Sequence, residues 1–155
     1  MMDHLKRFAA ELCGTFTLCM IAILAMAGTT AGDSGRLVAA MAYGLGVMAA
    51  MHAFGTFGAV HLNPAVTLAI FATGRGSFLR VLACIAGQLV GACLAGLPFT
   101  GAAMNPARAL ASAVAAIDFS SLWLCVCGSL AGGAVAGLIG RWFLAEGSAD
   151  AGRRG

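Results

Sequence analysis

The sequence predicts an all-α integral membrane protein with four membrane-spanning helices and two re-entrant half-helices. Hydrophobic residues make up 61% of the 155 residues and charged residues only 10%, whereas soluble domains average about 45–50% and about 25%. Four nearly uncharged segments are each about as long as a bilayer-spanning helix. The tripeptide Asn-Pro-Ala also occurs twice, each time at the start of an apolar segment that is too short to span.

The four predicted spans belong to a single domain over residues 1–155. They cover residues 8–27, 37–57, 78–97 and 122–144, and a bilayer-spanning helix needs about 20 residues. Lys6 and Arg7 precede the first span, as they would in a secretory signal. That segment is too long for a signal, however, and three more apolar segments follow, so we expect it to be retained as a helix.

The two short apolar segments, residues 63–73 and 105–116, predict half-helices that enter the membrane from opposite faces. Each follows a stretch that breaks any helix. Irregular backbone is tolerated at membrane depth only where protein covers it or where it lines a water-filled cavity. Only one span fits between the two segments, so they form an inverted pair whose tips meet at the midplane. This arrangement predicts a pore.

The Asn-Pro-Ala sequences suit the start of a half-helix. Proline is favoured at the first helical position and asparagine at the cap before it. If each asparagine oxygen accepts hydrogen bonds from its own helix, the side-chain amide is left to donate to a passing molecule. The positive end of each helix dipole would repel cations. A lone Asn-Pro-Ala is more simply an ordinary helix start, but its repetition before two short apolar segments favours the pore.

The distribution of charge predicts the orientation of the chain. If the spans alternate, the basic residues outside Arg36 and Arg108 fall on one side: Lys6, Arg7, Arg75, Arg80, Arg141, Arg153 and Arg154. This is the positive-inside pattern, so we expect a multi-pass protein of the cell membrane with both termini cytoplasmic and Arg36 external. It gives no indication of nucleic-acid binding.

The six cysteines all lie within apolar segments and form no paired CxxC motifs. We interpret them as small hydrophobic residues rather than as disulfide or metal ligands.

The chain resembles the aquaporin and glycerol-facilitator family, the major intrinsic proteins. The matching sequences are Glu-Leu-Cys-Gly-Thr-Phe at 11–16, His-Leu-Asn-Pro-Ala-Val-Thr at 61–67, Gln88, and Gly-Ala-Ala-Met-Asn-Pro-Ala-Arg at 101–108. The resemblance implies an aquaporin-like fold, a pore in every subunit and assembly as tetramers. It assigns the pore motifs to Asn63, Pro64, Ala65, Asn105, Pro106 and Ala107.

Further site residues follow from the same resemblance. Arg108 matches the arginine of the family's outer selectivity filter, and Tyr43 and Ala102 match two other filter positions. Glu11 resembles the buried glutamate that braces the cytoplasmic loop, which would account for a charge within a span. The backbone carbonyls that would line the cytoplasmic half of the channel belong to Gly58, Ala59, Val60 and His61. His52 matches no family role.

The sequence also departs from the family. Four spans are present where the family has six, and the gap, near residues 95–98, removes helices four and five together. The filter residue of helix five is therefore missing, although Cys93 falls at the matching distance before Arg108. Thr56 stands where the family often has histidine. Ala109 stands where glycerol facilitators typically have aspartate, so the resemblance leans toward water.

These observations favour a channel for water or small neutral solutes, without a cofactor or a metal. We expect a neighbouring copy to complete it in a homo-oligomer, through close-packing glycines at 87 and 91 or from 128 to 137. The alternative is a transport-incompetent truncated relative that acts as a membrane interaction partner or persists as a remnant. An enzyme has little support, because the ionisable residues form no acid–base pair, no metal-ligand cluster and no nucleophile with a base.

Overall fold

The computed structural model describes residues 2–27, 32–58, 60–95 and 105–151. Those residues form helices and connecting turns, with no strand among them. The elements in chain order are α1 (Met2–Ala27), α2 (Asp33–Phe54), the short 3₁₀ turn η1 (Gly55–Phe57), α3 (Pro64–Ala72), α4 (Phe78–Leu94), α5 (Pro106–Ala116) and α6 (Leu122–Ala151). The predicted all-α class is confirmed.

Among the described residues, three helices are long and apolar enough to cross a membrane: the segments Asp3–Met26, Asp33–Phe57 and Leu122–Ile139. The third predicted span corresponds to α4, an apolar helix of only 17 residues. At 1.5 Å per residue, α4 is about 25 Å long, somewhat less than a hydrocarbon core of about 30 Å. The rest of the expected span, from residue 96 onward, lies outside the described residues, so the count of four spans stays a prediction.

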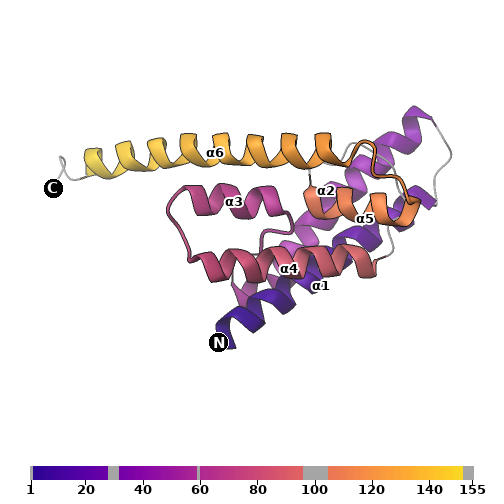
Figure 1. Cartoon of the computed structure of the whole chain (residues 1–155), viewed down its shortest axis with the longest axis horizontal. Coiled ribbons are helices and arrows are strands. Elements are labelled where there is room, and N and C mark those ends of the chain that lie inside the picture. Colours follow the sequence, from indigo (N-terminus) through magenta and orange to yellow (C-terminus); the bar gives the residue numbers. More distant parts are fainter. Residues whose placement is uncertain (1, 28–31, 59, 96–104, 152–155) are drawn as a thin grey trace.

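Figure 1 shows how the helices are arranged. The short helix α3 lies between α4 and the long helix α6, and α1 crosses beneath α4. The C-terminal part of α6 projects beyond the other helices. The two half-helices α3 and α5 are therefore held by α4 on one side and by α6 on the other, since each packs against both.

Glycines allow α1 and α4 to approach closely. A Cβ atom at Gly87 would collide with the backbone oxygen of Phe8, and one at Gly91 would collide with that of Leu12. Both glycines are buried. This corrects the expectation that Gly87 and Gly91 present a surface to another subunit, because that face is already used within the chain.

A second glycine contact joins α6 to α3. Cβ atoms at Gly133 and Gly137 would meet the backbone oxygens of Ala65 and Ala69 at 2.5 Å. Gly128 and Gly132 differ, since nothing lies within 4 Å of their Cβ positions. Only this part of the predicted 128–137 face is open to a partner.

Much of the apolar surface remains uncovered. Only 11% of the apolar window of α2 and 6% of that of α6 is buried, against 39% for α1. Large exposed side chains on these helices include Leu45, Met48, Trp123 and Leu138. Surface of this kind fits lipid or another membrane helix rather than water. All six cysteines are free in the structure: Cys19 and Cys84 are buried, Cys125 is partly buried, and Cys13, Cys93 and Cys127 are exposed.

Candidate functional site

The two asparagines cap the half-helices as their sequences predict. The Asn63 side-chain oxygen accepts a hydrogen bond from the Ala65 N–H at 2.9 Å, and Pro64 opens α3. The Asn105 oxygen accepts from the N–H groups of Ala107 at 3.0 Å and Arg108 at 3.4 Å, after which Pro106 opens α5. Each cap satisfies helix donors that have no partner within the helix.

The beginnings of the two half-helices are joined directly. The amide nitrogen of Asn105 donates to the backbone oxygen of Leu62 at 2.7 Å. Leu62 precedes Asn63 and has a positive φ of 59°, a conformation that costs a non-glycine residue about 1–2 kcal/mol. One donor of the Asn105 amide is therefore used to hold the other loop, which corrects the expectation that this amide is left wholly for a passing molecule.

Glu11 holds the same loop from the other side. Its carboxylate, 1% exposed, accepts from the backbone N–H of His61 at 2.7 Å and from that of Leu62 at 2.7 Å. A third donor is the Gln88 amide at 2.9 Å. A buried carboxylate is tolerable when several donors share its charge. The Leu62 peptide is thus fixed at its N–H by Glu11 and at its oxygen by Asn105.

Thr67 and Gln88 extend this network into α3 and α4. The Gln88 amide nitrogen also lies 2.9 Å from the Thr67 hydroxyl, which in turn donates to the Asn63 backbone oxygen at 3.2 Å. A His61 ring nitrogen lies 3.1 Å from the same hydroxyl. Sequence reasoning placed Gln88 and Thr67 only within matched segments. Each is a polar side chain in an otherwise apolar helix, and a buried polar side chain must find a hydrogen-bond partner. That pattern could have identified both as members of a network.

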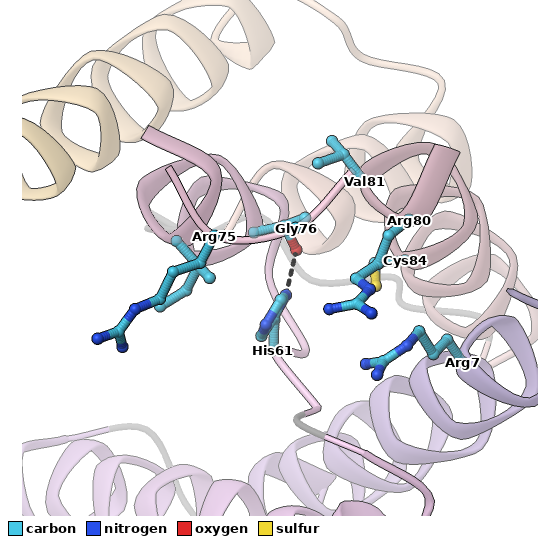
Figure 2. Close-up of a pocket in the computed structure, with 9 residues that line it drawn as sticks. Arg7, His61, Arg75, Gly76, Arg80, Val81 and Cys84 are labelled. Carbon is cyan, nitrogen blue, oxygen red and sulfur yellow. Dashed lines mark hydrogen bonds between the residues drawn. The ribbon is translucent and has the colours of Figure 1, made fainter. Parts of the chain in front are cut away.

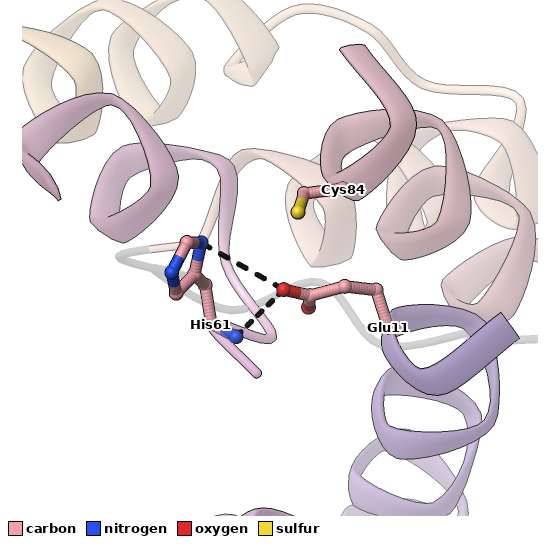
Figure 3. Close-up of side chains that lie close together, drawn as sticks. All are labelled: Glu11, His61 and Cys84. Carbon is pink, nitrogen blue, oxygen red and sulfur yellow. Dashed lines mark hydrogen bonds and ion pairs between the residues drawn. The ribbon is translucent and has the colours of Figure 1, made fainter. Parts of the chain in front are cut away.

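The structure also gathers three side chains of metal-ligating type. Figure 3 shows Glu11 directed at His61, with Cys84 nearby on α4. One ligand atom from each lies within 4.8 Å of the others, and the His61 ring nitrogen is 3.7 Å from the Glu11 carboxylate. Sequence spacing did not indicate this grouping, because its members come from three separate elements. Both carboxylate oxygens of Glu11 already accept hydrogen bonds from the loop and from Gln88, so Glu11 acts here as a brace of the loop.

The two predicted filter residues within the described chain, Tyr43 and Arg108, lie together. The Arg108 guanidinium carbon is 5.0 Å from the centre of the Tyr43 ring, a distance at which a cation is attracted to the ring face. The Arg108 Nε is buried without a hydrogen-bond partner.

Ala102, the third predicted filter position, lies outside the described residues. Cys93 is exposed on α4, and His52 is exposed with its ring against the Met48 oxygen.

The remaining predicted loop residues lie between η1 and α3. Gly58 has a φ of 122°, and a Cβ atom there would lie 2.9 Å from the Arg7 guanidinium, so glycine suits this position both in conformation and in space. Val60 is buried at 4% exposure. His61 is partly buried and lines a cavity of about 270 Å³ that also contains Arg7, Arg75 and Arg80. Ala59 lies outside the described residues.

Comparison with known proteins agrees with this geometry. The sequence profile of the family described as Major intrinsic protein matches the chain over residues 1–97 and 92–140. The chain belongs to the major intrinsic protein family. The two matched segments overlap at residues 92–97, close to where the sequence analysis placed the gap.

Relatives within the major intrinsic proteins include plant and bacterial aquaporins. The chain is 34% identical over 135 residues to the Probable aquaporin TIP2-2 of Arabidopsis thaliana, covering 84% of this chain and 50% of that protein. It is 44% identical over 80 residues to Aquaporin TIP2-1 of the same plant (48% of this chain, 32% of that protein). It is 37% identical over 95 residues to Aquaporin Z of Photorhabdus laumondii (59% and 41%). The chain therefore spans at most about half the length of these relatives.

Proposed function

We propose that the chain forms, together with further copies of itself, a channel for the passive passage of water or small neutral solutes across a membrane. The observation that carries this proposal is the hydrogen bond from Asn105 to the Leu62 oxygen, which brings the starts of the two half-helices together. The names of the relatives, all aquaporins, support the same function. A channel needs no catalytic residue, and we propose none.

The electrostatics of the joined helix starts suit neutral solutes. Each half-helix directs the positive end of its dipole, about half an elementary charge, toward the meeting point of α3 and α5. Arg108, in the first turn of α5, adds a full positive charge beside Tyr43. A cation or proton would be repelled there, while water or a small neutral molecule would not. We assign the filter to Tyr43, Arg108 and, from its motif position, Ala102.

A channel built from this chain needs further helices to enclose its pore. α6 contacts α3 and α5, and most of its surface is exposed, as is that of α2. Backbone at membrane depth must be covered by protein or by water. We propose that copies of the chain supply the cover, that they sit in the cell membrane, and that both termini face the cytoplasm.

One observation favours the alternative, a membrane interaction partner that transports nothing. Arg108 rests against Tyr43, and side chains in direct contact leave no passage between them. If the other walls of the filter approach Arg108 as closely as Tyr43 does, nothing passes, and the exposed faces of α2 and α6 serve only to bind other membrane helices.

Osmotic swelling of proteoliposomes tests the proposal. Vesicles with the purified chain should change volume faster than empty vesicles when the osmotic gradient is applied, and the double variant Asn63→Ala, Asn105→Ala should lose the difference. Asp33→Asn, which changes an exposed side chain at the start of α2, serves as the matched control and should leave the rate unchanged. Equal rates for the wild-type chain and empty vesicles, at verified incorporation, would favour the interaction partner.

A further inference from the structure

Three arginines line one cavity at the end of the molecule where α1 and α4 begin. The cavity, of about 270 Å³, is bounded by Arg7 from α1, Arg75 from the turn after α3 and Arg80 from the first turn of α4, together with His61, Thr67 and Gly76. Figure 2 shows the guanidinium groups of Arg7 and Arg80 close to each other on one side of His61, with Arg75 extending away from them on the other side.

The positive charge around this cavity exceeds the negative charge near it. Asp3 lies 3.2 Å from the Arg7 Nε and 3.9 Å from the Arg80 guanidinium, and it is 61% exposed. Arg75 is exposed and has no ion pair within the described part of the chain. The other neighbouring carboxylate, Glu11, is already engaged by the loop backbone and Gln88. Two carboxylates therefore face three guanidinium groups, and the excess favours an anion.

Arg80 also has an unused donor. Its Nε is buried and has no hydrogen-bond partner, although buried N–H groups in proteins are nearly always paired. Arg80 sits in the first turn of α4, where the Ser77 side chain accepts from its backbone N–H and the helix dipole adds positive potential. An oxygen of a bound anion would satisfy the guanidinium. Phosphate oxygens suit the planar donors of arginine especially well.

Exposed apolar side chains lie at the same ends of α1 and α4 as Arg7 and Arg80. Leu5 is 65% exposed, and Phe78 and Leu79 are each 63% exposed. They neighbour Arg7 and Arg80 in sequence. Apolar groups of this size fit the acyl chains of lipids, while the arginines lie at headgroup level. Basic pockets between membrane helices bind phosphorylated headgroups in this manner.

We propose that this cavity binds a phosphate group, carried by an anionic phospholipid or free in solution. The site depends on Arg75 and Arg80 as the accessible cations and on Arg7 as the inner one. Its test is independent of the proposed channel function, since binding requires no conduction.

Calorimetric titration of the detergent-solubilised chain tests this site. The probes are dioctanoyl phosphatidylglycerol, inorganic phosphate and, as a ligand without phosphate, dioctanoylglycerol. The test variant is Arg75→Gln, Arg80→Gln, which spares Arg7 because its guanidinium packs on Gly58. The matched control is Arg36→Gln, which removes an exposed arginine that is far from the cavity in sequence and paired with Asp33.

We expect phosphatidylglycerol to bind the wild-type chain and Arg36→Gln alike, and the double variant to bind at least about tenfold more weakly, as expected for lost charge-assisted hydrogen bonds. Competition by inorganic phosphate at similar affinity would identify free phosphate as the ligand; weak competition would identify the lipid. If the double variant does not fold, Arg75→Gln alone should weaken binding about threefold, because its side chain is exposed and carries little packing. Unchanged affinity in the folded variants, or equal binding of dioctanoylglycerol, would overturn the proposal.

Discussion

The side-chain amide of Asn105 donates to the backbone oxygen of Leu62 at 2.7 Å, so the start of one half-helix is tied to the residue that precedes the other. The bond joins residues 43 positions apart and is buried. The same asparagine also caps α5 through its side-chain oxygen. A substitution of Asn105 therefore removes both the cap and the link between the half-helices.

Replacing Asn105 with alanine should lower stability more than losing an ordinary cap does. Asn105→Ala removes the α5 cap and leaves the Leu62 oxygen buried without its donor, for a loss of about 2–4 kcal/mol. Ser77→Ala removes only the exposed cap of α4 and should cost about 1 kcal/mol or less. Thermal unfolding in detergent compares the two variants, and equal losses would show that the bond to Leu62 contributes nothing.

Glu11→Gln should destabilise the loop before α3. Glutamine offers one acceptor oxygen where the carboxylate offers two, so one of the two backbone donors would face an amide NH₂, at a cost of about 3 kcal/mol. Asp3→Asn, on the same helix but exposed, is the control and should change little. We expect a lower unfolding midpoint and faster proteolysis within residues 58–63 for Glu11→Gln alone. A variant as stable as the wild type would contradict the bracing role.

Two glycine substitutions should separate folding from assembly. Gly91→Leu would force α1 away from α4, because a Cβ atom there meets the Leu12 backbone, and it should reduce the yield of folded chain. Gly132→Leu meets nothing within 4 Å, so it should leave the fold intact and reduce oligomers if α6 binds a second copy there. Cross-linking in membranes with a measurement of helicity distinguishes the effects. Unchanged oligomers in Gly132→Leu would remove this face from the interface.

Arg108→Val should change the selectivity of the proposed channel more than its rate. The variant removes the charge beside Tyr43, so proton or small-cation leak should rise about tenfold or more while water flow persists. Arg141→Gln, an exposed arginine of α6, is the control. Fluorescent pH measurement and osmotic swelling in the same vesicles report both quantities. If neither quantity changes, Arg108 is not part of a filter.

Both termini should lie in the cytoplasm, because the basic residues outside Arg36 and Arg108 fall on one side of alternating spans. Epitope tags at each end should resist protease added outside intact cells and become sensitive after permeabilisation. A tag inserted beside Arg36 should show the opposite behaviour. Cleavage of either terminal tag in sealed cells would reverse the predicted orientation.

The features that local chemistry dictates were predictable from the sequence. The helix starts at Pro64 and Pro106 follow from the preference of asparagine for the cap and of proline for the first turn, and the structure has both. Contacts between distant segments were not predictable in this way. The positive φ of Leu62 is disfavoured for a side chain of that size, and no local signal indicates it. It is maintained by Glu11 and Asn105, which lie far from Leu62 in the sequence.

The packing partners of the glycines could not be predicted from the sequence either. A spacing of four residues indicates that two helices can approach closely, but it does not identify the partner. Gly87 and Gly91 match α1 of the same chain, whereas sequence reasoning assigned them to a neighbour. The arginine-lined cavity was missed for a related reason, because Arg7, Arg75 and Arg80 were interpreted only as indicators of orientation.

The contact of Gly133 and Gly137 with the backbone of α3 has a consequence for biosynthesis. A ribosome makes α3 well before α6, and α3, with 9 residues, is too short to remain across a bilayer by itself. Until α6 emerges, one side of this half-helix lacks the helix that later covers it. We therefore expect α3 to settle at membrane depth late, after α6 has been inserted. A nascent chain stopped before α6 should then leave residues 64–72 accessible to water-soluble labels.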